Sequence, residues 1–61
     1  MANEFLNHTL ESLETLLYQT KQHILVCREQ GRDEDLPDLN RAHAAIEKAI
    51  SEIHMTMAGL R

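Results

Sequence analysis

The sequence has few of the residues that usually hold very small proteins together. It contains one cysteine, Cys27, and only two aromatic residues, Phe5 and Tyr18, in a chain of 61 residues. An intramolecular disulfide is therefore excluded, and no Cys-x-x-Cys or cysteine–histidine cluster suggests structural zinc. A chain this short buries too little apolar surface alone and usually needs a staple or a partner. Association is the remaining route to stability.

Basic residues and long apolar runs are also scarce. Six Lys and Arg residues stand against ten Asp and Glu residues, and the formal net charge is -4. This balance disfavours broad electrostatic capture of nucleic acid or of an anionic membrane. No apolar run approaches the roughly 20 residues that span a bilayer, and the amino terminus lacks the basic-then-apolar pattern of a signal peptide. We expect a cytoplasmic protein with a reduced thiol and no membrane partner.

Hydrophobic residues nevertheless make up 43% of the chain, and their spacing is helical. In the first half they recur at alternating intervals of four and three, which is typical of a helix in a bundle. This first stripe consists of Leu6, Leu10, Leu13, Leu17, Thr20, Ile24 and Cys27. Phe5, Leu16 and His23 flank it, so the apolar face is wider than one neighbouring helix would cover. The pattern predicts a helix over about residues 4–30.

A second stripe follows the same rhythm. Its members are Leu39, Ile46, Ile53 and Leu60, interleaved with His43, Ile50 and Met57. Ala42, Ala45 and Ala49 form a flank of small residues beside it, which permits the close approach of a neighbouring helix. The pattern predicts a second helix over about residues 36–58.

Residues that start and stop helices lie where the stripes begin and end. Asn3 is placed to cap the first helix, and Gly31 suits the left-handed residue that ends one. Asp35 is placed to cap the second helix, Pro37 suits its first turn, and Gly59 is a second stop signal. The turn over residues 31–35 is so short that the two helices must be adjacent and antiparallel.

The whole chain, residues 1–61, therefore reads as one all-α domain, an antiparallel two-helix hairpin. A bare pair of helices has no enclosed interior, whereas two hairpins cover each other's flanks. We expect a homodimer that forms a four-helix bundle, with a trimer, a tetramer or a hetero-complex as other solutions. The residues expected in the core and dimer interface are Leu6, Leu10, Leu13, Leu17, Ile24, Leu39, His43, Ile46, Ile50, Ile53 and Met57.

The four histidines do not have the spacing of a metal site. His43 and His54 share a face but are about 16 Å apart at 1.5 Å per residue, too far for one ion. The Glu-x-x-His pairing of di-iron bundles occurs nowhere in the chain. We expect no metal and no cofactor. We interpret His43 and Thr20 as polar positions within the apolar stripes that fix register and orientation.

No arrangement of residues suggests catalysis. Cys27 is interpreted as a small buried side chain rather than a nucleophile, because no helix amino terminus lies near it to stabilise a thiolate. Thr9, Ser12 and Thr15 have no histidine–acid partnership, and a thin bundle offers little concave volume. We therefore expect that the protein is not an enzyme.

The overall plan resembles that of Rop, a plasmid copy-number regulator, which is an acidic helical hairpin of similar length that dimerises and binds paired RNA loops. This resemblance is architectural, without a shared motif, and it implies that net acidity does not dismiss RNA. The leucine-rich opening is also similar to that of small proteins from the early exo–xis region of lambdoid phages. This second resemblance is carried by Asn3, Glu4, Phe5, Leu6, Leu10, Leu13 and Leu17. It implies a compact regulator that acts on host physiology through protein contacts.

Three functions remain open. The favoured hypothesis is a non-enzymatic homodimer that binds another protein, as a phage-type regulator or an inhibitor of a host protein. The alternative is a Rop-like regulator of structured RNA or DNA, in which Lys21, Arg28 and Arg41 would contact nucleic acid. A further alternative is a subunit of a hetero-complex, such as an antitoxin, whose stripes fit a different chain.

Overall fold

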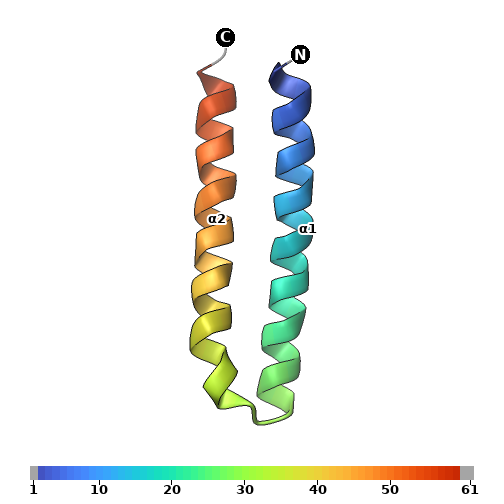
Figure 1. The fold of residues 1–61 in the computed structure, drawn as a ribbon, viewed down its shortest axis with the longest axis vertical. Coiled ribbons are helices and arrows are strands. Elements are labelled where there is room, and N and C mark those ends of the chain that lie inside the picture. The colour runs from blue at the N-terminus through green and yellow to red at the C-terminus, as the bar shows by residue number, and fades with distance from the viewer. Residues whose placement is uncertain (1, 60–61) are drawn as a thin grey trace.

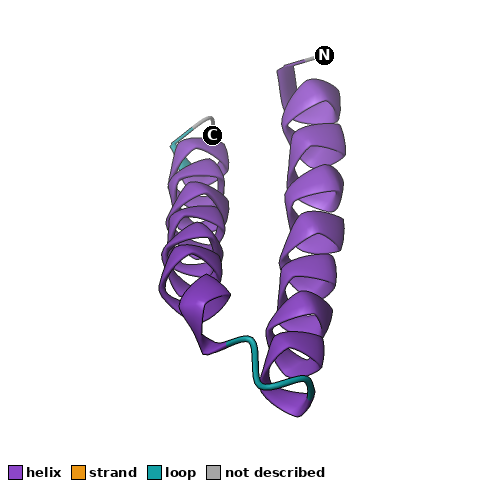
Figure 2. Cartoon of the chain, turned by 60° about the horizontal axis from the view of Figure 1, so that its bottom comes forward, coloured by secondary structure: helices purple, strands orange, loops and turns teal. Residues whose placement is uncertain are grey.

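The computed structural model describes the backbone of residues 2–59 and the side chains of residues 4–59. Two helices, α1 (Ala2–Glu29) and α2 (Leu36–Ala58), lie side by side and antiparallel, joined at one end by a short connection (Figure 1). This connection contains one 3₁₀ turn, η1 (Asp33–Asp35), which leads directly into α2 (Figure 2). No strand occurs in residues 2–59, so the predicted all-α class and the helical hairpin are confirmed.

The end of α1 depends on Gly31. Its φ of +68° lies in the left-handed region that L side chains rarely adopt. The N–H of Arg32 donates to the carbonyl of Cys27 at 2.8 Å, and the N–H of Gly31 donates to the carbonyl of Arg28 at 3.3 Å. These two bonds form a Schellman motif, which satisfies carbonyls that the helix would otherwise leave unpaired. The prediction that Gly31 ends the first helix is confirmed.

The two predicted amino-terminal caps are wrong. Asn3 lies inside α1, which begins at Ala2. Asp35 immediately precedes α2, but its backbone is already right-handed helical, with φ −87° and ψ −17°, and its side chain makes no capping hydrogen bond. A capping carboxylate needs an extended backbone to reach back to the first free N–H groups. Because η1 runs straight into α2, the carboxylate of Asp35 instead pairs with Arg32, with Nη2 and Oδ2 3.3 Å apart.

The two apolar stripes lie along the seam between the helices. Their described members are buried or partly buried, whereas most residues between them along each helix are exposed. Only Ile24 and Cys27 are buried among the described residues, at 8% and 9% exposure. Both lie at the turn end of the hairpin, where the connection adds cover. Leu60, the last expected member of the second stripe, lies outside the described residues.

The hairpin is a slab only one helix thick. Its principal extents are 47 × 15 × 10 Å, and its radius of gyration of 14.3 Å exceeds the roughly 10.5 Å of a compact domain of this length. The accessible surface of 4784 Å² likewise exceeds the roughly 4,000 Å² expected of a compact monomer of this size. The excess is about 750 Å², close to the roughly 800 Å² that each partner contributes to a standard interface. Neither helix of residues 2–59 is long and apolar enough to cross a membrane.

Candidate interaction faces

The predicted core and interface residues all lie on the seam. Except for Ile24, each remains partly exposed in the hairpin, although apolar side chains dominate the set. A single neighbouring helix covers one side of such a stripe and leaves its margins in contact with water. The remaining exposure therefore lies on the two broad faces of the slab.

The two polar members of the stripes are partnered within their own helices. Thr20 donates its hydroxyl to the carbonyl of Leu16 at 2.7 Å. Nδ1 of His43 lies 3.1 Å from Oε1 of Glu47, and the side chains of these two residues are 21% and 58% exposed. These local partners allow a polar side chain to occupy a partly buried position without an unpaired group.

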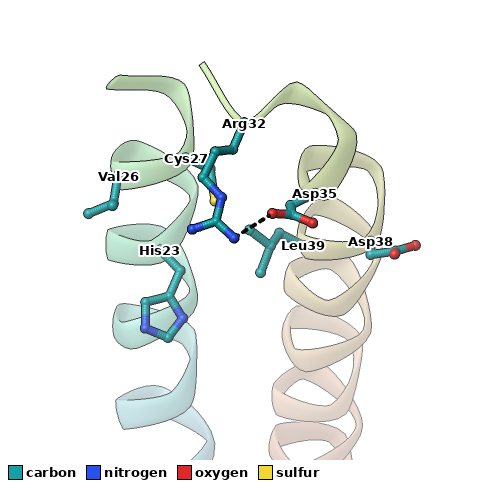
Figure 3. A pocket seen from close by; sticks show the side chains of 7 residues that line it. All are labelled: His23, Val26, Cys27, Arg32, Asp35, Asp38 and Leu39. Carbon is teal, nitrogen blue, oxygen red and sulfur yellow. Dashed lines mark ion pairs between the residues drawn. The ribbon is translucent and has the colours of Figure 1, made fainter. Parts of the chain in front are cut away.

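A hollow of about 380 Å³ opens between the helices at the turn end (Figure 3). It is lined by His23, Val26, Cys27, Arg32, Asp35, Asp38 and Leu39. The ion pair between Arg32 and Asp35 crosses it, so the carboxylate of Asp35 has a different partner from the helix N–H groups that its position predicts. Their three-residue spacing is the signal that could have indicated this pair. His23 and Cys27 are one turn apart, but no hydrogen bond joins them, so the hollow lacks an activated nucleophile.

The hollow shows which side of α1 shares a face with which side of α2. His23 of α1 and Asp38 of α2 both line it, although the carboxylate of Asp38 extends away from α1 (Figure 3). At 100° per residue, the residues 7, 14 and 18 positions before His23 lie within about 40° of its side of α1. The residues 4, 7, 11 and 18 positions after Asp38 likewise lie within about 40° of its side of α2. We name this surface the uncharged face: Phe5, Thr9, Leu16 and His23 of α1 with Ala42, Ala45, Ala49 and Thr56 of α2.

The opposite side of the hairpin has a different character. Lys21 lies about 160° around α1 from His23, and Glu47 lies about 180° around α2 from Asp38. We name this surface the charged face: Glu14, Tyr18, Lys21, Leu25 and Arg28 of α1 with Glu47 and His54 of α2. Tyr18 and Leu25 stand among these charges with 64% and 49% of their surface exposed.

The three residues proposed to contact nucleic acid are not gathered on one face. Lys21 and Arg28 are two turns apart on the charged face, where Glu14 and Glu47 offset their charge. Arg41 lies on α2, where it pairs with the carboxylate of Asp38. The hairpin by itself therefore presents no concentrated basic surface at these positions.

Metal-binding residues are also dispersed. No group of three or more His, Cys, Asp or Glu side chains within the described part of the chain is arranged to hold a metal ion. The closest pairing of this kind described above, His43 with Glu47, supplies two ligands at most.

Comparison of the chain with known protein families, with characterised proteins and with solved structures gave no match. Its function must therefore be argued from its own two faces.

Proposed function

We propose that this chain is a non-enzymatic interaction protein that pairs with a second copy of itself in a four-helix bundle. The bundle then binds another protein, as a phage-type regulator or an inhibitor of a host protein. The observation that carries this proposal is the thin slab, in which apolar stripes are only partly covered and both broad faces are bare.

Self-association is supported by the architecture, because the hairpin has a single layer of helices. Stable domains pack at least two layers of secondary structure around one core, and a slab 10 Å thick has only one. A second hairpin supplies that layer and can cover about 750 Å² of excess surface on each copy. Neither a disulfide nor a metal cluster stabilises the hairpin within the described residues, because the single cysteine is free and no group of metal-binding side chains occurs there.

Action through another protein is supported by the charged face. A homodimer that closes through one broad face leaves the other broad face exposed on each copy. Tyr18 and Leu25 would then form an exposed apolar pair bordered by charge, a combination found in protein interfaces, where aromatic side chains are enriched.

The first test is sedimentation equilibrium on the full chain, with helicity followed by circular dichroism across a dilution series. The proposal predicts a helical dimer whose melting temperature falls on dilution, because folding and association are coupled. A stable helical monomer at tens of micromolar would overturn self-association. A poorly folded monomer that gains helicity only with a different chain would favour the subunit of a hetero-complex.

The Rop-like alternative has less support from the placement of the basic residues. It predicts steeply salt-dependent binding to structured RNA or DNA that weakens when Lys21 or Arg28 is changed to Glu. Fluorescence anisotropy with a labelled RNA hairpin tests this, and absence of binding at low salt would remove the alternative.

A further inference from the structure

We infer that two copies of the hairpin pack through the uncharged face with their turns at the same end, so that α1 of each copy lies on α2 of the other. This inference rests on the proposed self-association and adds which surface closes and in which orientation. Three observations support it: the charges on the two faces, the sizes of the side chains on the uncharged face, and the positions of residues along the helix axes.

Charge selects the face. On α1 the uncharged face contains no Asp, Glu, Lys or Arg residue, and most of the residues on its α2 side are alanines. Asp38 lies on the α2 side of this face, at its turn end, and is paired with Arg41. Glu52 lies about 40° around α2 from Asp38, on the side away from the seam. Closing the charged face would instead remove Glu14, Lys21, Arg28 and Glu47 from water, at a desolvation cost that ion pairs rarely recover.

The two threonine hydroxyls of the uncharged face do not oppose burial. The hydroxyl of Thr9 donates to the carbonyl of Phe5 at 2.9 Å, and that of Thr56 donates to the carbonyl of Glu52 at 2.9 Å. Both hydroxyls therefore keep a hydrogen bond when a second copy covers them, which avoids the cost of an unpaired buried group.

Side-chain size selects which helices meet. The α1 side of the face carries large residues, of which Phe5 is 74% and Leu16 48% exposed, whereas the α2 side carries alanines and Thr56. Two facing helices pack most closely when the large side chains of one lie against the small side chains of the other. Stacking α1 on α2 achieves this at both contacts. Stacking α1 on α1 would place large side chains against each other and alanines against alanines.

The heights of the residues fit the same arrangement. Both helices rise 1.5 Å per residue, so the two stripes match when Leu17 is level with Ile46. Leu16 is then level with residue 47 of α2, between Ala45 and Ala49. A two-fold axis parallel to the helices preserves height, so Leu16 of one copy falls between Ala45 and Ala49 of the other. That axis places both turns at one end of the bundle.

The orientation is tested with one spin label on each turn. A Glu34→Cys, Cys27→Ala double variant, labelled with a nitroxide, gives the distance between copies by dipolar electron paramagnetic resonance. Turns at the same end predict a distance of about 20–25 Å, from helix spacings of 8–10 Å. Turns at opposite ends predict more than about 40 Å, because α1 is about 42 Å long at 1.5 Å per residue. The longer distance would overturn the inferred orientation and leave the dimer intact.

The face is tested with a matched pair of substitutions on α1. Leu16 and Leu25 are 48% and 49% exposed, but Leu16 lies on the uncharged face and Leu25 on the charged face. Leu16→Ala should raise the dimer dissociation constant by at least about 30-fold, and Leu25→Ala should change it by less than about threefold. Equal effects, or the reverse order, would overturn the choice of face. A monomeric unmodified chain would instead overturn the proposed self-association itself, so the two failures are distinguishable.

Discussion

Nδ1 of His43 lies 3.1 Å from Oε1 of Glu47, one turn further along α2. The contact joins a partly buried ring in the seam to an exposed carboxylate of the same helix. His43 is level with Thr20 of α1 if the two stripes match, so the seam contains one polar layer between apolar ones. A polar layer of this kind costs stability but penalises other registers.

Replacing His43 tests this role. His43→Leu should increase the free energy of unfolding by about 1 kcal/mol, because an apolar side chain packs better in the stripe. It should also broaden the distance distribution between spin labels on the turns, because the polar layer no longer selects one arrangement. Denaturant unfolding and the labelled variant measure the two effects. Glu47→Ala is the control and should cost less than about 0.5 kcal/mol, as expected for an exposed partner. A narrow, unchanged distance in His43→Leu would remove the register role.

Because Gly31 has a left-handed backbone at the end of α1, replacing it with alanine should cost stability, whereas the same change at Gly59 should not. Gly31→Ala should destabilise the fold by about 1 kcal/mol, because φ is +68° although no atom lies within 4 Å of the added Cβ. Gly59 has φ −78° in the right-handed region, and an added Cβ would make only ordinary contacts. Gly59→Ala should therefore be neutral or slightly stabilising. Urea unfolding measures the change in the free energy of unfolding for each variant. Equal changes for Gly31→Ala and Gly59→Ala would contradict the Schellman assignment.

Charge in the seam should abolish the fold. Leu17→Asp and Ile46→Asp each place a carboxylate in a partly covered apolar stripe, where burial of an unpaired charge is prohibitive in a bundle. We expect loss of both the dimer and most helicity, measured by sedimentation and circular dichroism. Glu52→Ala, at an exposed position, should have little effect on either. A folded monomer of Ile46→Asp would show that the hairpin is stable alone and that the bundle is not needed.

The small flank of α2 should respond to charge on one side only. Ala45→Glu adds a carboxylate to the uncharged face, whereas Ala44→Glu makes the same change 100° around the helix, away from that face. Both positions are exposed in the hairpin, so helicity of the single chain should be similar in the two variants. Analytical ultracentrifugation should show a dimer weakened at least about 10-fold by Ala45→Glu and nearly unchanged by Ala44→Glu. Equal weakening of both would mean that a different side of α2 is covered.

The helices and their stripes follow from the sequence because their determinants are local. The spacing of Leu6 to Cys27 and of Leu39 to Met57 places one face of each helix toward a neighbour, whatever that neighbour is. The stop at Gly31 is equally local, since only glycine adopts a left-handed backbone without strain. The cap at Asp35 was predicted wrongly because capping depends on the backbone before the helix, and residue type alone did not indicate the 3₁₀ turn.

The sequence by itself determined two amphipathic helices and a short turn between them. Only the tertiary structure decided that the connection forms η1, that Asp35 pairs with Arg32 across a hollow, and that His23 and Asp38 share one face. The reason is that helix formation depends on neighbours a few residues apart. The rotation of each helix about its axis, and hence the pairing of their flanks, depends on packing between residues far apart in the chain.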